Sequence, residues 1–178
     1  MRNWMNKKNW IQAAALCIGM AIAAGASARA DVTSELSAVK VAVGADGKEA
    51  FAPAPSVRPD ELIEYRLDYR NKGDESARAL EVTLPIPVGL EYLPSSAQPA
   101  GARASLDGKS YQAMPLKRMV KGADGKEIEQ PVAVSEYRFL RWSAGDLGAG
   151  KTARYTARMR VASGTVVLPA AASGAVAK

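Results

Sequence analysis

The chain contains 178 residues, with no histidine and a single cysteine, Cys17, close to the N-terminus. Residues 31 to 178 therefore contain neither of these residue types. For this part of the chain, the absence excludes disulfide bonds, thiol nucleophiles, histidine-based catalytic triads and the usual zinc and copper sites. A domain formed by these residues has to be stabilised by packing alone.

The first thirty residues have the composition of an export signal. A basic start is followed by a short apolar run from Ala13 to Gly25, and Ala28-Arg29-Ala30 supplies the small residues of a cleavage site. The run is shorter than the ~20 apolar residues of a membrane-spanning helix. Cys17 follows Leu16 in mid-run, where a lipoprotein signal requires a small residue. We therefore expect cleavage after Ala30 and export to the periplasm, or secretion to the cell surface.

The net positive charge comes mostly from this signal. The chain has 24 Lys and Arg against 18 Asp and Glu, and four of the basic residues but none of the acidic ones lie in residues 1 to 30, which leaves 20 against 18. A nearly neutral mature chain does not favour binding to nucleic acid. We expect an envelope or surface protein or polymer as partner, no cofactor, and no stable membrane span once the signal is cleaved.

Alternation of apolar and polar residues dominates the rest of the chain. It predicts strands at Val39 to Val43, Ile63 to Tyr69, Leu80 to Leu84, Glu136 to Trp142 and Lys151 to Val161. Short strands separated by turn residues are typical of an all-β antiparallel sandwich, which we place at residues 31 to 162. Phe51 to Pro59 is predicted to be an extended proline-rich link along a sheet edge, and residues 163 to 178 a flexible tail.

Asp-Gly-Lys occurs three times, beginning at Asp46, Asp107 and Asp124, and the hexapeptide GADGKE occurs at Gly44 to Glu49 and again at Gly122 to Glu127. Asp-Gly between alternating runs indicates a hairpin turn, because glycine accepts positive φ. A calcium loop requires several acidic or amide ligands at alternate positions, whereas each of these segments supplies one Asp. The turn interpretation is favoured, and no metal site is predicted.

Three stretches together resemble a known family. They are LIEYRLDYRNKGDESARALEVTLPIPVGLEYLP, ARASLDGKSYQAM and YRFLRWSAGDLGAGKTARYTARMRV, which match in order the motifs of the domain-of-unknown-function 11 family of bacterial surface and secreted proteins. The resemblance covers roughly Val39 to Val161. It implies an immunoglobulin-like β-sandwich in an exported envelope or surface protein, and it implies no catalytic residues. A single copy differs from the tandem copies of long surface proteins.

Trp142 is predicted to be buried, since it offers a large apolar ring and an indole N–H for a partner at the end of a strand. We expect Trp142→Ala to destabilise the domain severely and Arg158→Ala to have little effect. Asn71-Lys72-Gly73 is predicted to form a corner between two strands, because its glycine accepts positive φ.

Glu64 and Asp68 fall on one face of the second predicted strand and superficially suggest the carboxylate pair of a glycosidase. Four strand residues at ~3.4 Å each separate them by ~14 Å, which exceeds the ~5 to 9.5 Å of such pairs. The alternating charges of this strand instead suit a solvated sheet face with cross-strand ion pairs.

Arg154, Arg158 and Arg160 share one face of the last predicted strand. We interpret these three residues, the arginine stripe, as a candidate contact surface for an anionic polymer or an acidic partner. The alternative is that the stripe lies beside the strand of Glu64 or Glu81 and is neutralised there.

Three aromatic residues, Tyr111, Tyr137 and Phe139, raise the possibility of a sugar-binding platform. The favoured alternative places aromatic residues of this region in the core, where they bury large areas. Alternation alone does not fix which side of the strand Glu136 to Trp142 faces inward.

The sequence therefore favours a non-enzymatic, exported module with a structural or protein-binding role in the bacterial envelope or surface. A module that binds glycans or anionic polymers is the second interpretation. A hydrolase, which clustered carboxylates from separate strands would favour, is the third.

Overall fold

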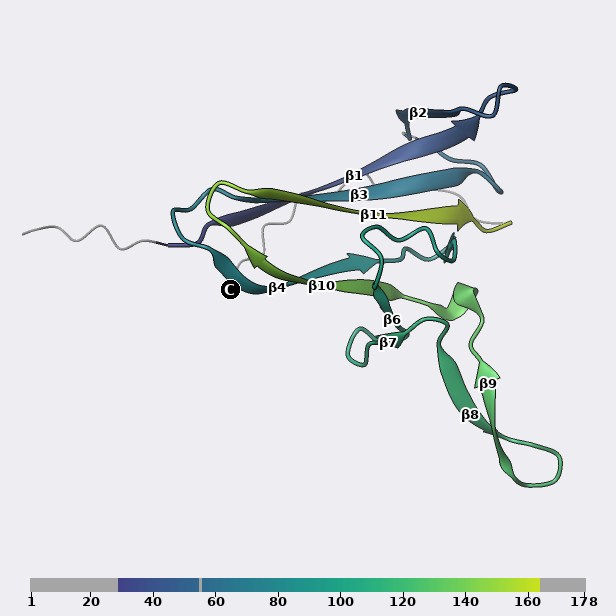
Figure 1. Cartoon of the computed structure of the whole chain (residues 1–178). Coiled ribbons are helices and arrows are strands. Elements are labelled where there is room, and N and C mark those ends of the chain that lie inside the picture. The colour runs from purple at the N-terminus through teal and green to yellow at the C-terminus, as the bar shows by residue number, and fades with distance from the viewer. Residues whose placement is uncertain (1–28, 55, 164–178) are drawn as a thin grey trace, which may run out of the picture.

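The computed structural model describes residues 29–54 and 56–163. Most of the predicted export signal and all but the first residue of the predicted tail lie outside this range. The described chain is all-β, and two packed antiparallel sheets form an immunoglobulin-like sandwich, which confirms the predicted fold (Figure 1).

The larger sheet contains five strands with β3 at its centre. In spatial order they are β2 (Glu49–Pro53), β1 (Val32–Val43), β3 (Leu62–Asn71), β11 (Thr152–Val161) and β5 (Leu90–Tyr92). The second sheet has four strands, in the order β4 (Ala77–Pro85), β10 (Phe139–Leu147), β6 (Arg103–Ser105) and β7 (Gln112–Ala113).

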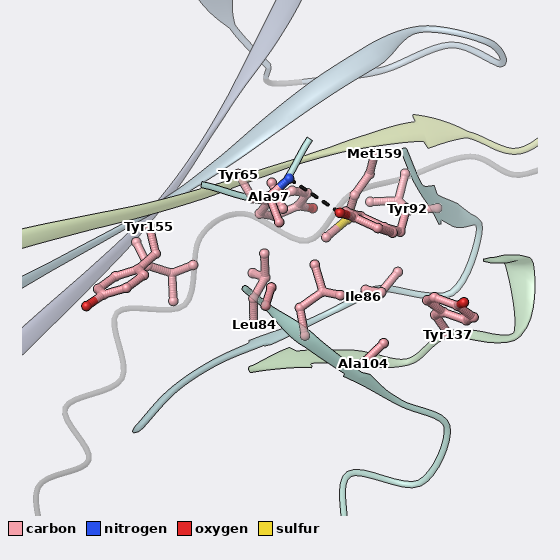
Figure 2. Close-up of a cluster of buried hydrophobic side chains, with 14 of the residues drawn as sticks. Tyr65, Leu84, Ile86, Tyr92, Ala97, Ala104, Tyr137, Tyr155 and Met159 are labelled. Carbon is pink, nitrogen blue, oxygen red and sulfur yellow. Dashed lines mark hydrogen bonds between the residues drawn. The ribbon is translucent and has the colours of Figure 1, made fainter. Parts of the chain in front are cut away.

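The core lies between these sheets and is rich in tyrosine (Figure 2). The rings of Tyr92 and Tyr137 stack with centroids 6.5 Å apart. The Tyr92 hydroxyl accepts a hydrogen bond from the Ala97 amide at 3.3 Å, and the Tyr137 hydroxyl accepts one from the Leu116 amide at 2.8 Å. Each buried hydroxyl thus has a partner, so burial of the two rings leaves no phenol unsatisfied.

The structure decides which side of the strand around Trp142 faces inward. Leu140 and Trp142 are buried in β10, whereas Phe139 is half-buried. Tyr137 is also buried, although strict alternation would place it on the opposite face from Trp142. The reason is that β10 begins only at Phe139, and Tyr137 follows a short 3₁₀ helix, Val134–Glu136, so strand alternation does not extend back to it.

The first strand is longer than predicted and begins at Val32. In its register with β3, Val39 lies opposite Glu64, so the predicted valine row belongs to the outer face of the sheet. The predicted proline-rich link starts at Phe51, which lies within β2. This strand is at the edge of the larger sheet, as expected.

A third, two-stranded sheet consists of β8 (Lys117–Lys121) and β9 (Glu127–Pro131). This hairpin extends away from the sandwich (Figure 1). Only its turn at Asp124 was predicted, because the charged sequences KRMVK and EIEQP carry little apolar alternation. Within residues 29–54 and 56–163, no helix has the length and apolarity needed to cross a membrane.

Candidate functional site

The register of the larger sheet places the arginine stripe against acidic residues of β3. Arg154 lies opposite Asp68 and Arg158 lies opposite Glu64, while Arg160 lies opposite Leu62. Because directly opposed side chains of an antiparallel pair share a face, the first two arginines meet carboxylates.

Arg154 forms a two-pronged ion pair with Asp68. Its Nε and Nη2 donate to Oδ1 and Oδ2 at 2.7 and 3.0 Å. The hydrogen bonds from this guanidinium to Asp68 raise the pKa of Arg154. The arginine side chain is more than half exposed, so solvent screens the pair and its contribution to stability is small.

Arg158 is bound by two carboxylates. Its Nη1 and Nη2 donate to the two oxygens of Glu49 at 2.6 and 2.7 Å, and its Nε donates to Glu64 at 3.0 Å. The hydrogen bonds from Arg158 lower the pKa of Glu49, and those to Glu49 raise the pKa of Arg158. Arg66 Nε donates to the other oxygen of Glu64 at 2.8 Å. The nearly buried Glu64 carboxylate is therefore satisfied on both oxygens.

The same network holds the edge strand β2. The guanidinium of Arg66 lies 4.6 Å from the centre of the Phe51 ring, a cation–π contact, and Glu49 comes from the same strand. These contacts join β2 to β3 and β11 across the outer face. The arrangement changes the expectation for Arg158→Ala, because this side chain is a structural tie rather than a solvated one.

Arg160 is exposed, and among the described residues it forms no ion pair. The arginine stripe is thus mostly neutralised within the sheet. This is the arrangement that the alternative interpretation expected, with Glu64 as one of the neutralising residues.

The carboxylates of Glu64 and Asp68 do not act as a pair. Glu64 accepts hydrogen bonds from Arg158 and Arg66, and Asp68 accepts them from Arg154. Among the described residues, no group of three or more potential Asp, Glu, His or Cys ligands gathers in a geometry that could hold a metal ion.

The three candidate aromatic residues do not present coplanar exposed rings. Tyr137 is buried in the core, and the Arg141 guanidinium lies over the Tyr111 ring at 3.7 Å. Phe139 is half-buried, and its ring packs close to the backbone at Gly108. These positions do not form the sugar-binding platform that would favour the second interpretation.

The two GADGKE copies fold into the same turn. The amide of Gly44 donates to the Lys48 carbonyl at 2.8 Å, and the amide of Gly122 donates to the Lys126 carbonyl at 2.8 Å. In each copy the Asp carboxylate accepts the Lys amide two residues later at 3.1 Å. The second glycine has φ of 76° in one copy and 78° in the other. Each turn is followed by a five-residue strand that ends in proline, Glu49–Pro53 in β2 and Glu127–Pro131 in β9.

The β8–β9 hairpin carries two exposed apolar residues, one on each of its faces, that sequence reasoning missed. Met119 and Ile128 are exposed by 58% and 52%, although both are large apolar residues. Two of the flanking cations are paired, with Lys117 Nζ 2.6 Å from Glu129 and the Arg118 guanidinium donating to both oxygens of Glu136 at 2.8 and 2.9 Å. The repeated hexapeptide was the sequence signal for this hairpin, because its first copy joins two strands.

Two hollows lie near the base of the hairpin. The larger has a volume of about 620 Å³ and a mainly apolar lining that includes Tyr92, Ala97, Ala102, Met114, Val134 and Tyr137. The smaller, of about 150 Å³, is bordered by Leu106, Asp107, Gln112, Leu116, Lys117 and Val132. The smaller hollow therefore lies beside Lys117, the first residue of β8.

No match was found when the chain was compared with protein-family models, curated proteins and solved structures. The candidate surfaces thus depend on the chain's own geometry.

Proposed function

We propose that this chain is an exported, non-enzymatic module that binds another protein in the bacterial cell envelope or at the cell surface. The observation that carries the proposal is the β8–β9 hairpin, which projects from the sandwich and exposes Met119 and Ile128. These side chains offer apolar area on both faces of the hairpin that a partner could bury. The predicted export signal and the resemblance to the domain-of-unknown-function 11 family support the proposed location.

The hairpin is a better candidate than the arginine stripe for this contact. Arg154 and Arg158 are bound to carboxylates of their own sheet, so a partner would have to displace those carboxylates. Met119 and Ile128 already face solvent, and their burial by a partner would be favourable.

Site-directed photo-crosslinking in intact producing cells, followed by cell fractionation, tests this proposal. A photo-reactive residue in place of Ile128 should yield a discrete adduct in the envelope or surface fraction. The matched control is the same residue at Val88, which is 84% exposed but lies between β4 and β5. Absence of an adduct at Ile128, or the same adduct from both positions, contradicts the proposal.

A further inference from the structure

The two GADGKE hairpins differ in what lies beside their first strand. In the first hairpin, β1 is paired with β2 on one side and with β3 on the other. In the second hairpin, β8 is paired with β9 alone among the described strands. The second copy therefore has an open edge at the place where the first copy holds a third strand.

The backbone groups of this open edge follow from the register. The Gly122 amide donates to Lys126, and the Val132 amide donates to Leu116 at 2.9 Å, so the hydrogen-bonded pairs fall at even-numbered residues of β8. In an antiparallel ladder the intervening residues direct their N–H and C=O groups away from the partner strand. Lys117, Met119 and Lys121 therefore offer a row of donors and acceptors to an incoming strand.

We propose that this open edge of β8 binds an extended segment of a partner protein as an antiparallel third strand, and that acidic and aliphatic residues alternate in this segment. The inference rests on the proposed protein-binding function and specifies the mode of contact. Strand addition of this kind gains affinity from main-chain hydrogen bonds and specificity from alternate side chains.

The chemistry of the partner follows from the strand that β8 already holds. The β9 sequence EIEQP places Glu127 and Glu129 on the face of β8 that carries Lys121, Met119 and Lys117, and Ile128 on the other face opposite Val120. Glu129 forms a diagonal ion pair with Lys117 at 2.6 Å. An added strand would meet the same β8 side chains from the other side. In the part of the chain that the structure describes, Lys121 forms no ion pair, so it is available to an acidic residue. Aliphatic residues of the added strand would lie on the other face beside Val120, as Ile128 of β9 does.

The hollow of about 150 Å³ beside Lys117 adds a second element of recognition. Leu106, Leu116 and Val132 contribute apolar side chains to its lining. A segment that follows β8 toward the sandwich would reach this hollow, which has room for one aliphatic side chain. Acidic residues along the edge and an aliphatic residue at its base thus describe the expected partner.

A second copy of this chain does not fit the open edge. If β9 of a second copy paired antiparallel with β8 of the first, the hairpins of the two copies would point in the same direction. The two sandwiches would then be held ~10 Å apart, the distance of two strand spacings. Even a 100-residue domain has a radius of gyration of ~13 Å, so the sandwiches would collide. In a symmetric dimer, β8 of one copy would pair with β8 of the other. With the two Met119 residues opposite each other, Lys117 of one copy would lie opposite Lys121 of the other. Like charges directly opposite are destabilising.

Two synthetic peptides test the proposal, acetyl-EIEVEI-amide and its basic counterpart acetyl-KIKVKI-amide. Binding to the mature protein is followed by ¹⁵N NMR titration, with shifts expected at the amides of Lys117, Met119 and Lys121. The acidic peptide should bind at least about tenfold more tightly at low salt, and this preference should shrink as salt screens the exposed charges. Equal affinity for both peptides, or shifts confined to residues outside β8, overturns the proposal.

Met119→Pro is the decisive variant, because it removes an outward N–H without removing a hydrogen bond to β9. It should weaken binding of the acidic peptide at least about fivefold. The matched control is Glu127→Pro, which makes the same change on the free edge of β9 and should leave affinity within about twofold. Unchanged binding by Met119→Pro overturns strand addition.

Further measurements separate the remaining outcomes. If Met119→Pro disturbs the hairpin amides of Val120 and Ile128, Lys121→Glu replaces it and should also lower affinity for the acidic peptide. Light scattering of the mature protein should give a monomer; a salt-sensitive dimer that Met119→Pro abolishes would show that the edge takes a second copy instead. If the cellular adduct from Ile128 persists in Met119→Pro, protein binding stands and strand addition is overturned.

Discussion

The guanidinium of Arg158 in β11 donates two hydrogen bonds, of 2.6 and 2.7 Å, to the carboxylate of Glu49 in β2. These strands are not neighbours, since β1 and β3 lie between them in the sheet. The same arginine donates to Glu64 on β3. One side chain therefore ties the edge hairpin to the centre of the larger sheet.

Arg158→Ala should lower the Tm by at least about 3 °C, because it removes contacts to two carboxylates and leaves the nearly buried Glu64 with Arg66 alone. Arg154→Ala, which removes a more exposed pair, is the matched control and should shift the Tm by less. Arg158→Lys should restore stability only in part, since an ammonium group lacks the planar fork. Thermal unfolding followed by circular dichroism measures all three. Equal Tm values for the two alanine variants would show that the tie contributes nothing.

Trp142→Ala should destabilise the domain by ~3 to 5 kcal/mol, because the buried ring packs against Tyr155 with centroids 5.5 Å apart. Trp142→Phe should cost less, although it loses the bond from Nε1 to the Pro99 carbonyl at 2.8 Å. Urea unfolding monitored by circular dichroism provides the free energies. A loss below 1 kcal/mol for the alanine variant would contradict the observed packing.

Asp107 should give the protein an acid-sensitive turn. Its carboxylate accepts hydrogen bonds from the amides of Ser110 and Lys109 and from the Ser105 hydroxyl, which lower its pKa to about 2. A carboxyl group whose pKa is lowered on folding stabilises the protein above its ordinary pKa near 4 and loses that contribution as the pH falls toward 2. The stability difference between wild type and Asp107→Asn should therefore be largest at neutral pH and shrink between pH 4 and 2. Urea unfolding across this pH range measures the difference. A difference in the free energy of unfolding that stays constant from neutral pH to pH 2 would contradict the prediction.

Gly47→Ala and Gly125→Ala should separate the two copies of the same turn. Both glycines have positive φ, which costs roughly 1 to 2 kcal/mol for a residue with a Cβ. Gly47 joins two strands of the main sheet, so its substitution should lower global stability. Gly125 lies in the projecting hairpin, so hydrogen exchange should show loosening confined to β8 and β9. Identical effects on global unfolding would indicate that the hairpin unfolds together with the sandwich.

The mature chain should begin at Asp31, as the order of basic, apolar and small residues before it predicts. In the structure, the Asp31 amide donates to Asn71 Oδ1 at 3.2 Å, immediately before β1 begins. Intact-mass spectrometry of exported protein checks the cleavage site. A mass that includes residues 1 to 30 would contradict it.

The sequence by itself determined the fold class and much of the core. Period-two alternation in Ile63, Tyr65 and Leu67 was sufficient to predict which side of β3 is buried, because a strand in a sandwich has one dry face. Trp142 was correctly expected inside, and the hexapeptide copies were correctly expected to form turns. These features depend on local backbone preferences and on the pattern of apolar and polar residues, both of which can be read from a sequence.

Only the tertiary structure decided what lies beside each strand. The arginine stripe reads as a free basic surface until the register sets Arg154 and Arg158 against Asp68 and Glu64. The two GADGKE copies are the same in sequence and in local hydrogen bonding, yet one hairpin is built into a sheet and the other projects alone. Strand neighbours and ion-pair partners come from residues far apart in the chain, and non-local pairing carries no local pattern that the sequence could display.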